Sequence, residues 1–226
     1  MRWSVAKGRV GMRRRHAGLC LCALAPLLLL PLGARAEGPP ATQTPPPREQ
    51  SAWPDPELRQ QLLTRAERDQ QVRRAALDSA DFDAAWRQVT HIDQDNTAWL
   101  KQIVAAQGWP GATRVGRDGA NAAFLLIQHA DADPEFQAQV LPLMQAAVAA
   151  QEAEAVDLAM LTDRVLLAQG KPQRYGTQFK NNADGSMSMQ ATEDPANLDA
   201  RRARMGLPRM DVYKKSLSDL YHKPVK

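Results

Sequence analysis

The sequence predicts a mainly α-helical, single-domain bundle of about five or six helices with a small C-terminal β-hairpin. Apolar residues recur at spacings of three and four through most of the stretch 57–169, which is the period of an amphipathic helix. Between residues 173 and 191 they alternate instead, on either side of an Asp-Gly turn, as in a hairpin. Both cysteines precede residue 23, so the rest of the chain has no disulfide, thiolate zinc site or cysteine nucleophile.

Residues 1–36 have the organisation of a secretory signal peptide: a basic stretch, an apolar run and an Ala34-Arg35-Ala36 cleavage site. The run spans about 14 residues and a membrane-spanning helix needs roughly 20, so a retained anchor is the weaker alternative. We expect cleavage near Ala36 and a periplasmic or secreted protein with no stable membrane anchor. The proline-rich residues 37–56 should form a disordered linker.

The charge of the chain is uneven. It has 29 Lys and Arg against 25 Asp and Glu, but residues 1–36 hold seven of the basic residues and none of the acidic ones. The remainder therefore has a formal charge of −3. Net charge gives no reason to expect nucleic acid or an anionic membrane as a partner.

Two charged residues project into the apolar stripe of the first predicted helix, 57–79. Asp69 and Arg73 lie four residues apart and point close to the direction of Leu62. One interpretation is a surface ion pair at the edge of the stripe, worth about 0.3–0.5 kcal/mol. The other is a core-facing carboxylate and guanidinium with further partners, and the sequence leaves both open.

The second predicted helix, 95–107, is preceded by acidic residues. Asp93 and Asp95 stand where N-caps belong, so capping is their default role. Asn96 is harder to explain, because it lies one turn before Leu100 on the buried face.

The third predicted helix, 120–131, is almost wholly apolar until its last turn, which contains His129. A histidine there is more often a hydrogen-bonded core residue than a catalyst, and its position at a helix C-terminus should favour its charged form. The next helix should start at Pro134 and bend at Pro142.

The helix at 155–169 is apolar on two sides, which predicts a central position. Asp163 falls inside one apolar stripe, and an unpaired buried carboxylate would cost several kcal/mol, so it needs a partner. Arg73 is a candidate partner, whereas Arg164 points about 100° away from Asp163.

Known motifs are absent. Two calcium-like stretches lack the required loop ends, and there is no HExxH, GxSxG, Walker or GxGxxG pattern. No metal and no cofactor are predicted. A carboxylate-rich metal site that combines His129 with Asp93, Asp131 or Asp163 is the lesser alternative.

Several strings together resemble an uncharacterised bacterial family, domain of unknown function 6624, across about residues 55–215. They are RDQQVRR (68–74), DNTAWLKQIVAAQGWPG (95–111), QHADADPEFQ (128–137), LTDRV (161–165), QRYGTQF (173–179) and EDPANLDARRARMGLP (193–208). The resemblance implies an α-helical domain with a small C-terminal hairpin and no established activity. From the sequence pattern we place the domain at 57–220, the hairpin near 173–191 and a tail at 221–226. The polar motif positions of the family coincide here with Asp69, Gln70, Arg73, Asn96, Gln128, His129, Asp131, Asp163, Arg164, Gln173, Tyr175 and Gln178.

Two hypotheses follow. In the first, these residues converge on a pocket for a small polar ligand or substrate, with His129 and Asp163 as the catalytic pair if the protein is an enzyme. In the second, they form a buried network that fixes the packing of a structural or interaction module. Oligomeric state is not predicted.

The hairpin should form one wall of such a pocket. By the period of two, Tyr175, Thr177 and Phe179 share one face, and Gln178 lies on the other. The larger apolar load favours Tyr175 and Phe179 facing inward. The YGTQ string of the family favours the alternative, in which a twist or bulge turns Gln178 toward His129.

Overall fold

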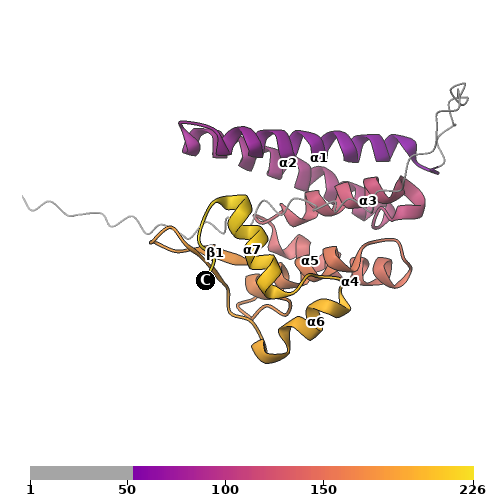
Figure 1. Cartoon of the computed structure of the whole chain (residues 1–226). Coiled ribbons are helices and arrows are strands. Elements are labelled where there is room, and N and C mark those ends of the chain that lie inside the picture. Colours follow the sequence, from indigo (N-terminus) through magenta and orange to yellow (C-terminus); the bar gives the residue numbers. More distant parts are fainter. Residues whose placement is uncertain (1–52) are drawn as a thin grey trace, which may run out of the picture.

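A computed structural model describes residues 53–226, so the predicted signal peptide and most of the linker lie outside the described residues. The described part is mainly α-helical, with seven α-helices and one two-stranded antiparallel hairpin, which confirms the predicted fold class (Figure 1). None of its helices is long and apolar enough to span a membrane.

The first five helices form the body. Helix α1 (Pro56–Leu77) pairs with α2 (Phe82–Gln107), and α3 (Ala112–Gln128) packs against both. Helices α4 (Pro134–Ala149) and α5 (Ala155–Ala168) form a second pair, and α5 also contacts α3. Helix α3 is thus central, between the α1–α2 pair at the top of Figure 1 and the α4–α5 pair below.

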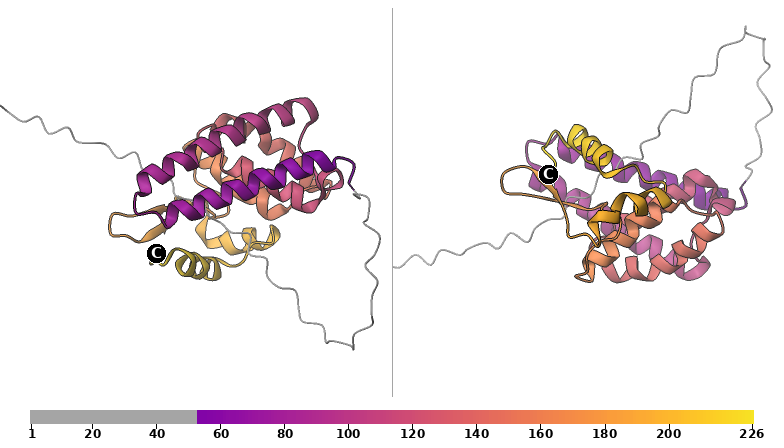
Figure 2. Two further views of the ribbon diagram at one scale, coloured as in Figure 1. Left: turned by 90° about the horizontal axis from the view of Figure 1, so that it is seen from above. Right: turned by 60° about the horizontal axis from the view of Figure 1, so that its bottom comes forward.

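The C-terminal part adds the hairpin and two short helices. Strands β1 (Phe179–Asn181) and β2 (Met187–Met189) pair antiparallel. A 3-10 turn (Pro195–Asn197) leads into α6 (Leu198–Arg204), and α7 (Met210–Tyr221) follows. Figure 2 shows α6 and α7, in yellow, on one side of the body. Because α7 is a regular helix, the described chain has one or two helices more than the predicted five or six.

Two apolar clusters hold these parts together. The larger lies among α1 to α5 and includes Leu62, Leu100, Ile127 and Leu161. A smaller one beneath the hairpin joins β1 and β2 to α7. The hairpin region thus has a core of its own, and its attachment to the body depends largely on polar contacts.

The start of α2 differs from the prediction. The helix begins at Phe82 rather than near residue 95, and the side chain of Asp81 caps it by accepting from Ala84 N at 2.9 Å. The capping role predicted for Asp93 and Asp95 is therefore wrong, because both lie well inside the helix.

The limits of α3 and the hairpin also differ. Helix α3 begins at Ala112, changes direction at Gly116, where φ is +76°, and ends before His129 rather than at residue 131. The strands are shorter than the predicted 173–191, because Gly176 adopts φ +65° and leaves residues 173–178 as a loop. Pro142 lies inside α4.

Candidate functional site

A buried charged cluster joins α1 to α2. Arg73 Nε lies 3.1 Å and Arg73 Nη2 3.3 Å from the carboxylate of Asp69, one helical turn earlier, and both side chains are about 1% exposed. Arg73 Nη2 also forms an ion pair with Asp93 of α2. The core-facing interpretation of Asp69 and Arg73 is therefore the correct one.

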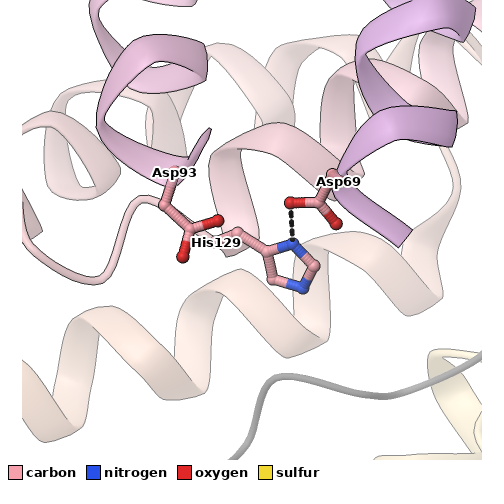
Figure 3. A group of neighbouring side chains, drawn as sticks. All are labelled: Asp69, Asp93 and His129. Atoms are coloured by element: carbon pink, nitrogen blue, oxygen red, sulfur yellow. Dashed lines mark hydrogen bonds and ion pairs between the residues drawn. The ribbon is translucent and has the colours of Figure 1, made fainter. Parts of the chain in front are cut away.

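His129 reaches this cluster from the end of α3. Its Nδ1 lies 3.0 Å from Asp69 Oδ1, although the two residues are 60 positions apart (Figure 3). An ionised Asp69 can only accept, so Nδ1 carries the proton in this contact. His129 Nε2 lies 3.4 Å from the side-chain nitrogen of Gln128, so the Gln128 amide donates and His129 Nε2 accepts. Asp69 thus fixes both the tautomer and the orientation of the ring.

Burial and pairing set the charges of the cluster. Burial raises the pKa of Asp69, but the contacts with His129 and Arg73 outweigh it and leave the pKa below its usual range. Burial lowers the pKa of His129, so the imidazole is neutral near pH 7. For Asp93, burial outweighs the attraction of Arg73 and raises the pKa to about 7. The cluster therefore combines an ionised carboxylate, a neutral base and a carboxyl group that titrates near neutrality.

The same residues are the ones that a metal would use. One ligand atom each from Asp69, Asp93 and His129 lie within 4.8 Å of one another. However, the guanidinium of Arg73 already contacts both carboxylates, so a metal ion would lie beside a fixed positive charge. This donor set does not fit a resident metal, and we assign none.

Asp163 belongs to a second network, away from Arg73. Its carboxylate accepts from the backbone N–H of Arg174 at 2.7 Å, of Tyr175 at 2.9 Å and of Thr177 at 2.9 Å, and from the Thr177 hydroxyl at 2.8 Å. The predicted pairing with Arg73 is therefore wrong. Burial raises the pKa of Asp163, and these four hydrogen bonds oppose the rise. Asp163 anchors the loop 173–178 on α5.

Gln173 holds the same loop from inside. Its side-chain nitrogen donates to the carbonyls of Gln178 at 3.0 Å and Gln190 at 3.1 Å, and its oxygen accepts from Gln178 N at 2.9 Å. Arg202 of α6 donates to the carbonyls of Tyr175 and Pro208, both at 2.7 Å. The loop is thus held through its N–H groups and its carbonyls at once.

Gln178 itself is buried rather than facing solvent. Its side-chain nitrogen donates to the Thr177 hydroxyl at 2.9 Å, and it makes no hydrogen bond to His129. Its Oε1 has no hydrogen-bond partner among residues 53–226. A buried acceptor of this kind costs about 1–3 kcal/mol when unpaired.

Arg164 and Asp131 form a third contact, between α5 and the residues that follow α3. Arg164 Nη1 lies 2.6 Å from Asp131 Oδ1, and the Gln137 amide holds Asp131 and the carbonyl of Gln128, each at 3.3 Å. Arg164 is close enough to His129 to lower the pKa of the imidazole further. This contact therefore lies beside the cluster of Asp69 and His129.

The remaining predicted residues lie at the edge of the cluster or apart from it. Gln70 donates to Asp69 Oδ2 at 2.9 Å. Asn96 is buried, but its oxygen accepts from Arg65 at 3.0 Å in an open groove of about 500 Å³ between α1 and α2. Arg65 stacks 4.5 Å from the ring of Trp99 there. This groove contains Asn96 and none of the other predicted site residues.

Sequence reasoning missed several buried polar residues. They are Gln137, Asp157, Thr177 and Arg202. Gln137, Thr177 and Arg202 lie inside the strings quoted above, which could have singled them out. Asp157, with a pKa that burial raises to about 7, carries no comparable signal, because its burial depends on the packing of α5.

These features define a class: a helical bundle whose buried carboxylate, imidazole and guanidinium groups meet between three helices. A family model matches residues 56–226, and the chain belongs to that family, DUF6624, which is described as a family of unknown function. Comparisons with curated proteins and with solved structures gave no significant match.

Proposed function

We propose that the Asp69–His129 pair is the centre of a site for a small polar ligand or substrate. One observation carries the proposal: the 3.0 Å contact between Asp69 Oδ1 and His129 Nδ1, which holds a neutral imidazole in a single tautomer. A base oriented by a carboxylate is the arrangement that proton transfer requires, and such a base contributes typically about 10²- to 10⁴-fold to a rate.

The neighbouring groups suit the same chemistry. His129 Nε2 can accept a proton, and Asp93, with a pKa of about 7, can supply or return one near neutrality. Asp93 is also the most solvent-exposed member of the cluster, with 20% of its side chain accessible. A substrate would therefore approach His129 from the side of Asp93.

A ligand screen with matched variants tests the proposal. Thermal unfolding of the wild-type protein is measured with sugars, amino acids, nucleotides and organic acids at millimolar concentration, since a ligand at 100 times its Kd stabilises by about 2.7 kcal/mol. We expect at least one class to raise the Tm of the wild type and to leave His129→Gln unchanged. A class that stabilises both proteins equally would bind elsewhere.

A second candidate is a structural network, and the second cluster favours it. Among residues 53–226, the side-chain hydrogen bonds of Asp163 and Gln173 all go to residues of the hairpin region, so these two residues fasten the loop and need no ligand. Variants of His129 and Asp69 decide whether the first cluster behaves likewise. Melting temperatures that are unchanged or raised favour a site, whereas a loss of several degrees with no ligand response favours a network.

We also infer that the protein is exported. Support comes from the organisation of residues 1–36 and from the absence of cysteine after residue 22, which makes folding independent of oxidation. Mass spectrometry of the exported form should find an N-terminus at Glu37. An intact Met1, or a lipid-modified cysteine at the N-terminus, would show that the leader is misinterpreted.

A further inference from the structure

The contact between Arg164 and Asp131 is unequal in exposure. The Arg164 side chain is 6% exposed, whereas its carboxylate partner Asp131 is 44% exposed. A buried guanidinium needs an anion close by, because it has lost most of its hydration. Here that anion comes from a surface residue in the turn after α3.

This pair differs from the pair of Asp69 and Arg73 in how readily another anion can replace its carboxylate. Asp69 and Arg73 are both about 1% exposed, so separating them would leave a buried charge. The Asp131 carboxylate can instead turn into water when another anion takes its place on Arg164, because nearly half of its side chain is already exposed.

The location of the pair connects it to His129. Asp131 follows His129 by two residues, and the Gln137 amide ties Asp131 to the carbonyl of Gln128. An anion on Arg164 would therefore lie next to the imidazole. A second anchor for a polar substrate is needed there, because Arg73 is already taken up by two carboxylates.

We propose that Arg164 binds a carboxylate or phosphate group of the ligand of the His129 site, and that Asp131 occupies this position when the ligand is absent. The inference rests on the proposed function and adds its ligand class, a small oxoanion. Asp131 is then an internal competitor, so removing its charge should tighten anion binding, whereas general electrostatics would give only a small gain at any acidic surface residue.

The experiment measures anion binding to the mature full-length protein by isothermal titration at constant ionic strength. The probes are sodium phosphate and sodium acetate, with sodium chloride as the reference. The variants are Asp131→Asn, Arg164→Gln and, as the matched control, Glu193→Gln, whose carboxylate pairs with the half-exposed Arg174 at 2.9 Å.

We expect Asp131→Asn to bind phosphate or acetate about five- to tenfold more tightly than the wild type, because the Asp131 carboxylate no longer competes for Arg164. Arg164→Gln should not bind either probe, and Glu193→Gln should match the wild type. Whichever probe tightens more identifies phosphate or carboxylate as the preferred group. Because Asp131 is exposed, its variant should fold even if Arg164→Gln does not.

The proposal is overturned if Asp131→Asn binds both anions no better than the wild type, or if Glu193→Gln tightens binding equally. The ring signals of His129 in an NMR titration separate this result from the proposed function, with the exposed His91 as reference. Tighter anion binding without a shift at His129 would support the anion position and remove His129 from the site.

Discussion

Gln173→Ala gives the sharpest test of how the hairpin region is attached. The buried Gln173 amide makes three hydrogen bonds to backbone groups of Gln178 and Gln190, at 2.9–3.1 Å. Each contributes about 1 kcal/mol net, and the lost methylene adds about 0.8 kcal/mol. The free energy of unfolding should therefore fall by about 3–4 kcal/mol, which lowers the Tm of a domain of this size by roughly 8–12 °C.

The assay is thermal and urea unfolding followed by circular dichroism, with Gln169→Ala as the control. Gln169 is exposed at the end of α5, where its oxygen accepts only from Lys171 Nζ at 3.0 Å, so its loss should change the free energy of unfolding by under about 0.5 kcal/mol. A decrease below about 1 kcal/mol for Gln173→Ala would refute the reasoning. In that case Gln173 would be free to serve the ligand role that the sequence suggested.

Four further predictions follow from the charged cluster and the loop. The pKa of Asp93 is raised to about 7, so its contribution to stability is present below about pH 4 and is lost as the pH rises to 7. Urea titrations at pH 4–8 should show a smaller loss in Asp93→Asn than in the wild type, and the loss that remains comes from the other buried carboxylates, among them Asp157. The lowered pKa of His129 has the opposite effect on stability: the wild type should lose stability as the pH falls below about 6.5, and His129→Gln should not show this loss. Arg73→Met leaves buried carboxylates unpaired and should cost about 3–5 kcal/mol in the same assay, and a cost below 1 kcal/mol would contradict the pairing. Gly176→Ala should destabilise more than Gly185→Ala: both have positive φ, worth about 1–2 kcal/mol, but only at Gly176 would the new Cβ meet a methionine side chain, at 2.7 Å.

Helical periodicity predicted which polar side chains are buried better than it predicted their partners. Asp69, Arg73 and Asp163 each fall in an apolar stripe, and each is buried. The direction in which a side chain leaves a helix depends only on the helical period, so the sequence is enough to predict it. The partner of Asp163 depends on a loop that begins ten residues later, and no local rule places that loop beside α5.

The wrong role for Asp93 has a different cause. Its position before the apolar Leu100 is typical of a helix start, but the earlier apolar residues Phe82, Trp86 and Val89 belong to the same helix. In the structure Phe82 and Trp86 stack, with ring centroids 5.3 Å apart, and Val89 is buried. Extending the helix to Phe82 turns Asp93 from a cap into an interior residue that faces Arg73.

Helix α5 connects the Asp163 network with the cluster around His129, although the sequence predicted one pocket for both. Asp163 and Arg164 are adjacent, so their side chains leave the helix about 100° apart. Asp163 therefore holds the loop 173–178, while Arg164 reaches Asp131 beside His129. A change that loosens the loop also frees α5 on one side, and the position of Arg164 depends on that helix. The loop residues can thus influence the proposed His129 site without touching a ligand, so one set of motif positions can include both residues of that proposed site and residues that only position them.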